Sequence, residues 1–145
     1  MKRILVATDG SESAGRAIDF AAALAKDAHA DLLIANVIGG YGLPGEVFRR
    51  FTQSQTAWLE ELLQAHSAEV LTEARERTLR LGVAAVEIES RAGDVAQTLS
   101  DLAAAKGVDA IVVGRRGAGG VATLLLGSAA HKLVSLATLP IVVVP

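Results

Sequence analysis

Short apolar segments rich in β-branched residues alternate along this chain with helical patterns, and this alternation limits the possible folds more than any other feature. Four of the segments consist almost entirely of apolar residues, which is typical of parallel strands buried on both faces. A fifth alternates apolar and charged side chains, so we expect an edge strand whose glutamates discourage pairing with another chain. The expected strands cover residues 4–7, 32–38, 86–90 (the alternating segment), 110–113 and 141–144.

Helical patterns occupy the intervals between these strands. Strands and helices that alternate in this way form a parallel sheet through right-handed crossovers. The predicted fold class is therefore α/β: a single domain over residues 1–145, with a doubly wound open sheet of five parallel strands and helices on both faces. The expected helices run from a cap at Ser11 or Ser13 to about Lys26, from about 53 to 81, from a cap at Asp94 to Gly107, and from 127 to about 136.

In the longest of these helices, the spacing of Trp58, Leu62 and Val70 indicates an apolar stripe with polar interruptions. The composition also suits helices packed on a sheet. Hydrophobic residues make up 51% of the chain and aromatic residues 3%, so the core must be built from alanine, valine, leucine and isoleucine.

Composition and charge argue against several classes of function. The chain has no cysteine, which excludes disulfides and thiolate zinc sites and suits a reducing compartment. A formal net charge of −2 disfavours a protein devoted to nucleic acid. No stretch approaches the roughly 20 apolar residues of a membrane span, and the apolar run after Lys2 and Arg3 is too short for a signal peptide. We therefore expect a soluble cytoplasmic protein without nucleic-acid or membrane partners.

A glycine-rich segment follows the fourth expected strand. It reads Gly114, two residues, Gly117, nine residues, then Gly127 and Ser128, where the last helix starts. Glycines permit positive φ and a close approach of the backbone to a ligand. The amides and dipole at a helix start favour phosphate. On these grounds alone, a nucleotide-binding loop and a mobile loop with a serine cap are equally supported.

Two other glycine motifs fit poorly. A P-loop needs lysine and then serine or threonine after its second glycine, whereas Gly119 is followed by Gly120 and Val121. The spacing of Gly117, Gly119 and Ala122 satisfies a relaxed dinucleotide fingerprint. However, it follows the penultimate strand and lacks an acidic residue about 20 positions beyond. Both alternatives are therefore disfavoured.

The pattern G-x2-G-x9-G-[ST] resembles the ATP-binding signature of the universal stress protein family. Residues 4–11 (ILVATDGS) are similar to the first strand and turn of that family, and residues 124–128 (LLLGS) and 139–145 (LPIVVVP) also match it. The resemblance covers the whole chain. It implies a regulatory stress-response protein of the ATP-binding branch, with a Rossmann-like sheet in the strand order 3-2-1-4-5.

The same resemblance implies a residue-by-residue assignment of the site. Asp9 would contact the ribose or approach the metal on the phosphates, although Asp-Gly-Ser is also ordinary turn chemistry. The backbone of Val37 would lie against the adenine, and Ala7 stands where nucleotide-binding relatives often have proline. The ribose and phosphates would be enclosed by Gly114, Gly117, Gly127, Ser128 and Ala129.

ATP, with Mg, is the expected ligand, and AMP or cyclic AMP is the alternative because the adenine and ribose contacts would be shared. Relatives often carry a cation within the nine-residue insert. Here the cations are Arg115 and Arg116, which we expect to be solvated loop charges in preference to γ-phosphate ligands. No general base is evident, so no enzyme activity beyond slow ATP hydrolysis is expected. The alternatives are a slow ATPase or nucleotide-transfer enzyme, and a structural stress protein that binds no nucleotide.

A homodimer is the expected assembly. Residues 141–144 are four β-branched residues without an internal charge or proline, and in the implied strand order they form the outermost strand. Exposed apolar edges of this kind invite pairing with another chain. Members of the family that this chain resembles commonly dimerise through the last strand, so we expect two copies to pair there in antiparallel fashion.

Overall fold

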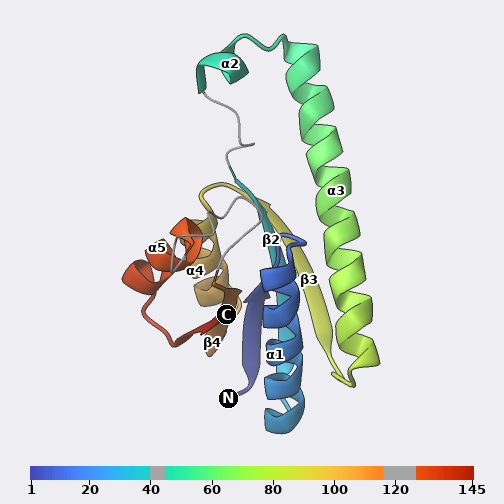
Figure 1. The fold of residues 1–145 in the computed structure, drawn as a ribbon, viewed down its shortest axis with the longest axis vertical. Helices are drawn as coiled ribbons and strands as arrows, with labels where there is room; N and C mark the ends of the chain where they lie inside the picture. Colours follow the sequence, from blue (N-terminus) through green and yellow to red (C-terminus); the bar gives the residue numbers. More distant parts are fainter. Residues whose placement is uncertain (40–44, 116–126) are drawn as a thin grey trace.

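Five parallel strands form one sheet in the order β3-β2-β1-β4-β5 (Figure 1). The computed structural model describes residues 1–39, 45–115 and 127–145. The predicted fold class and strand order are confirmed. The strands are β1 (Arg3–Ala7), β2 (Asp31–Ile38), β3 (Val86–Ala92), β4 (Ala110–Gly114) and β5 (Ile141–Val144).

Helices cover both faces of this sheet. One face carries α1 (Glu12–Ala28) and α3 (Gln53–Arg80), and the other carries α4 (Val95–Ala105) and α5 (Ser128–Leu136). The expected caps are present, since the side chain of Ser11 accepts the Ala14 N–H and that of Asp94 accepts the Gln97 N–H. A short helix, α2 (Gly45–Arg49), was not expected from the sequence. Within the described residues, no helix is both long and apolar enough to cross a membrane.

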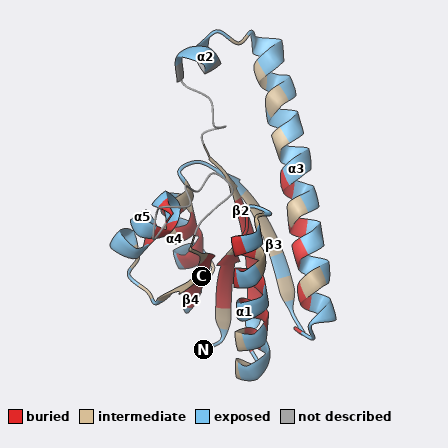
Figure 2. Ribbon diagram, in the orientation of Figure 1, coloured by how far each residue is buried: buried red, intermediate tan, exposed pale blue. Residues whose placement is uncertain are grey.

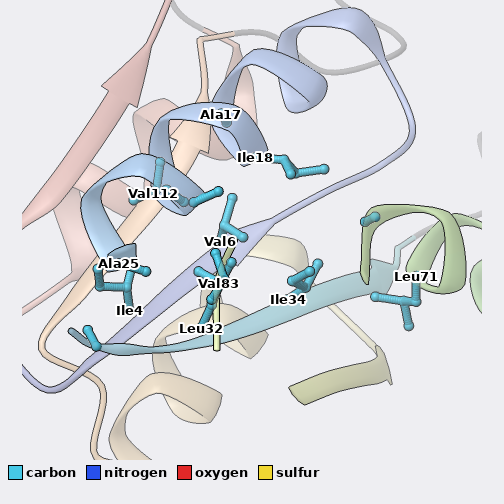
Figure 3. Packing of buried hydrophobic residues seen from close by; sticks show 14 residues of the cluster. Ile4, Val6, Ala17, Ile18, Ala25, Leu32, Ile34, Leu71, Val83 and Val112 are labelled. Atoms are coloured by element: carbon cyan, nitrogen blue, oxygen red, sulfur yellow. The ribbon is translucent and has the colours of Figure 1, made fainter. Parts of the chain in front are cut away.

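The core lies on the two faces of β1, β2 and β4. Alternate residues point to opposite faces, so Ile4 and Val6 pack beneath α1 while Leu5 packs towards α4 and α5 (Figure 3). The buried face of α1 consists largely of alanine, which lets this helix lie close to the strands. Because most side chains on that face are small, the start of α1 can lie near the end of β4.

β3 is the edge strand that the alternating pattern predicted. The Nζ atom of Lys106 lies 2.7 Å from a carboxylate oxygen of Glu87 and 3.1 Å from one of Glu89. The hydrogen bond from Lys106 holds the pKa of Glu87 below its ordinary value. Charge therefore covers this edge of the sheet, as expected.

Only the second half of α3 packs against the sheet. Its buried residues are Ser67, Leu71, Ala74 and Thr78, and the first half extends past the carboxyl ends of the strands together with α2 (Figures 1 and 2). The first half of the predicted stripe is not covered by the sheet, since the side chains of Trp58 and Leu62 are 62% and 47% exposed. Helical periodicity reports which residues share a face, and it does not report where along a long helix the sheet ends.

Because only the second half of α3 is covered, a leucine-to-alanine substitution should destabilise the protein more there than in the first half. Leu71 is 3% exposed, so Leu71→Ala should leave a cavity and lower the free energy of unfolding by about 2–5 kcal/mol. Leu62→Ala on the extended half should change it by no more than about 0.5 kcal/mol. Urea denaturation of both variants measures the difference. Equal losses would mean that the first half of α3 is covered in solution.

Candidate functional site

The candidate site lies at the carboxyl ends of β1 and β4. These strands pair side by side, with Val6 opposite Val112. The helix after β1 covers one face of the sheet and the helix after β4 covers the other. Open α/β sheets bind ligands at such a reversal of winding.

The turn between β1 and α1 is held by its own polar side chains. The Gly10 N–H donates to the hydroxyl of Thr8 at 3.2 Å, and the Ser11 N–H donates to the carboxylate of Asp9 at 2.9 Å. Gly10 has φ of 83°, which disfavours any residue with a side chain. Asp9 therefore acts within the turn, and its side chain is exposed at the site.

Gly114 is required by packing and not by its own φ. A Cβ atom at this position would lie 2.5 Å from the hydroxyl oxygen of Ser13 and 2.9 Å from the Ser13 backbone. Its φ is not positive, and Gly127 has φ of −65°. Neither glycine therefore supplies a positive φ. Gly114 instead allows the first turn of α1 to rest on the end of β4.

Arg115 joins the end of β4 to both β5 and α5. Its N–H donates to the carbonyl of Val144 at 2.7 Å, and its carbonyl accepts the Gly127 N–H at 2.6 Å. The two described ends of the glycine-rich segment, Arg115 and Gly127, therefore lie side by side. Gly117 and Arg116 lie outside the described residues, so the positions predicted for them stay predictions.

The start of α5 faces this junction without a side-chain cap. Gly127 is its N-cap, and no side chain there accepts a hydrogen bond. Ser128 and Ala129 are exposed, and the first turn carries no acidic residue. Backbone amides and the positive end of a helix dipole at such a position favour an anion.

Ala7 and Val37 lie on the face of the sheet that carries α4 and α5. Both side chains pack partly buried against that core. Ala7 pairs with Ala35, two residues before Val37 on β2. The end of β2 is in turn covered by the loop before α4, because the Gly93 N–H donates to the Ile38 carbonyl at 3.1 Å.

An ion pair ties the start of α4 to α5. Asp94 accepts the Gln97 N–H at 3.0 Å and binds the Nζ atom of Lys132 at 2.9 Å. The backbone hydrogen bond and the hydrogen bond from Lys132 hold the pKa of Asp94 below its ordinary value. Sequence reasoning found the cap at Asp94 but missed its ion pair with Lys132, and it missed the contact between Ser13 and Gly114, because in each case the two partners come from distant segments without a motif.

The match to known proteins extends over the entire chain. Residues 1–145 match the model of the universal stress protein family. The chain belongs to the universal stress protein family. It is 32% identical to the universal stress protein YxiE of Bacillus subtilis, over 98% of this chain and 97% of YxiE. The resemblance stated from the motifs is therefore confirmed.

Solved structures of the family share the fold. UspA from Lactobacillus plantarum superposes with a TM-score of 0.83 at 24% identity, over 99% of this chain and 97% of UspA. A universal stress protein in complex with cAMP gives a TM-score of 0.70 at 26% identity, over 99% of this chain and 95% of that protein. The structural neighbours of this chain thus include an adenine nucleotide complex.

The contact at Gly114 yields a stability prediction that needs no ligand. Gly114→Ala should lower the free energy of unfolding by about 1–3 kcal/mol, because the Ser13 backbone must move to admit the methyl group. Gly15→Ala is the matched control. There the new Cβ meets the movable guanidinium of Arg77 at 3.1 Å, and the helix gains propensity, so the change should stay within about 1 kcal/mol. A neutral Gly114→Ala would show that α1 does not approach β4 this closely in solution.

Proposed function

We propose that this universal stress protein binds an adenine nucleotide, ATP with Mg, at the carboxyl ends of β1 and β4. The observation that carries the proposal is the convergence of the signature's described residues. Ser13 lies against Gly114, and Arg115 binds Gly127 at the uncapped start of α5. The complex of a related protein with cAMP supports the class of ligand.

In this proposal the start of α5 binds the phosphates. The amides of Ser128 and Ala129 and the hydroxyl of Ser128 donate to phosphate oxygens. Asp9 approaches the magnesium ion on the phosphates, the backbone of Val37 lies against the adenine, and Ala7 borders the ribose. Gly117 lies outside the described residues, and its predicted part in enclosing the ribose and phosphates stays a prediction.

The role that we propose is regulation through occupancy. Phosphoryl transfer needs a residue that orients the attacking group and cations that neutralise developing charge. In the described part of the site, the carboxylate of Asp9 already accepts the Ser11 N–H. Because no general base is evident in the sequence, we propose binding with at most slow hydrolysis.

The amide of Ser128 offers a sharp test of phosphate binding. Proline is tolerated at the first position of a helix, and Gly127 has ψ of 155°, which suits the residue before a proline. Ser128→Pro should therefore keep the fold while it removes one N–H and the hydroxyl. Ser128→Ala, the matched control, removes the hydroxyl alone.

We expect nucleotide-free wild type to gain about 2.7 kcal/mol of stability at 100 times the dissociation constant of ATP·Mg. Ser128→Pro should lose most of this gain, whereas Ser128→Ala should keep most of it. Calorimetric titration with ATP, AMP and cyclic AMP, with and without Mg, ranks the ligands. If millimolar ATP leaves wild type unaffected, the proposed function is wrong. Normal binding by Ser128→Pro would place the phosphates elsewhere.

We also propose a homodimer that pairs β5 with its own copy. Apolar side chains flank β5 on both sides of the sheet: Val134 and Leu136 on α5 are 51% and 39% exposed, and Phe20 on α1 is 45% exposed. The guanidinium of Arg16 donates to the Pro145 carbonyl at 2.8 Å, so the face of α1 that carries Arg16 and Phe20 lies on the β5 side. A two-fold contact would bury these residues together with the strand edge.

Along β5, the backbone N–H and C=O groups of successive residues point alternately towards β4 and towards the open edge, and this identifies the residue to change. The carbonyls of Pro140 and Val144 accept the N–H groups of Ile111 in β4 and of Arg115 just after it, so the backbone groups of Ile141 and Val143 point to the open edge. Val143→Pro should remove one outward donor, leave the pairing with β4 intact and yield a monomer. Val143→Ala should remain a dimer of about twice 15.0 kDa by light scattering. A monomeric wild type, or a dimeric Val143→Pro, would refute this interface.

A further inference from the structure

Asn36 is a polar residue in an apolar row of β2. Leu32 and Ile34 precede it on the same face and are 1% and 0% exposed beneath α1 and α3. Asn36 is 9% exposed, although its amide group has two donors and an acceptor. Burial of an amide is unfavourable unless it is hydrogen-bonded, so its partner explains its place in this row.

That partner is the turn before α1. The Nδ2 atom of Asn36 donates to the carbonyl oxygen of Thr8 at 2.7 Å. The backbone ladder between β1 and β2 has its last register pair at Ala7 and Ala35, so the Thr8 carbonyl lies just past the ladder. The Asn36 side chain thus adds one hydrogen bond where the paired strands end and the turn begins.

Through the Thr8 carbonyl, a side chain of β2 holds the turn between β1 and α1. Thr8 is 5% exposed, its N–H donates to the Ala35 carbonyl at 2.9 Å, and its hydroxyl accepts the Gly10 N–H. Both sides of Thr8 are therefore anchored to β2, and Asp9 follows at once. The position of the Asp9 peptide depends on these bonds.

α3 passes near the same turn. A Cβ atom on Gly10 would lie 3.4 Å from Val70, so the turn is already in contact with this helix. One helical turn earlier, the hydroxyl of Ser67 lies 2.8 Å from that of Ser90, and Ser90 is the register partner of Asn36 on β3. α3 is thus held to the sheet at the level of Asn36.

We infer that Asn36 is a positioning residue of the nucleotide site, which holds the Thr8–Gly10 turn so that Asp9 meets the ligand. The inference rests on the proposed function and adds to it a residue that does not itself touch the nucleotide. Sequence alone gave Asn36 no role, because a polar residue near the end of a strand carries no motif.

Two variants distinguish the hydrogen bond that the Asn36 side chain donates from the shape of that side chain. Asn36→Leu removes the donor and suits the apolar row, so the fold should persist. Asn36→Asp keeps the shape but has only acceptors when ionised. Ser67→Ala is the control, because Ser67 is 1% exposed and binds Ser90, so its loss lowers stability without removing a bond to the turn.

The first measurement is amide hydrogen exchange in the protein without nucleotide. Both Asn36 variants should speed exchange at Gly10 and Ser11 by about tenfold, because the turn loses a buried hydrogen bond. Ser67→Ala should leave these two amides within about twofold of wild type. Unchanged exchange in Asn36→Leu would overturn the inference, whatever the affinity.

The second measurement is calorimetric titration with ATP·Mg. Both Asn36 variants should bind about tenfold more weakly, and Ser67→Ala should bind within about twofold of wild type. Faster exchange with wild-type affinity, or an equal loss in Ser67→Ala, would overturn the role in binding. A wild type that binds no ATP would refute the proposed function instead, and the exchange data would still decide whether Asn36 holds the turn.

Discussion

The close approach of α1 to the sheet is the contact on which the rest of the site depends. The helix presents a mainly alanine face to β1 and β4, and Gly114 at the end of β4 has no side chain to keep Ser13 away. The turn that carries Asp9 is thereby brought against the end of β4. From there Arg115 connects to β5 through Val144 and to α5 through Gly127. A larger side chain at Gly114 would separate two segments that the proposed ligand must contact together.

Around this contact, polar groups at the carboxyl end of the sheet replace the apolar packing of its middle. Towards the amino end, β2 contributes Leu32 and Ile34 to the core, and at the carboxyl end it contributes Asn36. Ser67 and Ser90 join α3 to β3 at the same level. Hydrogen bonds are directional where apolar contacts are not, so they suit a place where one turn must be held in a single geometry.

The two edge strands differ in charge: β3 is charged, and β5 is apolar. β3 carries Glu87 and Glu89, which Lys106 bridges, and such charges resist pairing with another chain. β5 carries no charge and is flanked by exposed Phe20, Val134 and Leu136. The first half of α3 also leaves Trp58 in solvent. The difference between the edges favours assembly at β5.

The sequence by itself determined the fold class, all five strands, the cap at Asp94 and the membership of the family, and it narrowed the cap of α1 to Ser11 or Ser13. These follow from local patterns: β-branched runs, capping side chains and a glycine signature with fixed spacing. It could not determine which half of α3 is covered, why Gly114 must be glycine, or what Asn36 and Lys132 bind. Each of those depends on contacts between segments far apart in the chain, and only the folded arrangement of helices on the sheet brings the partners together.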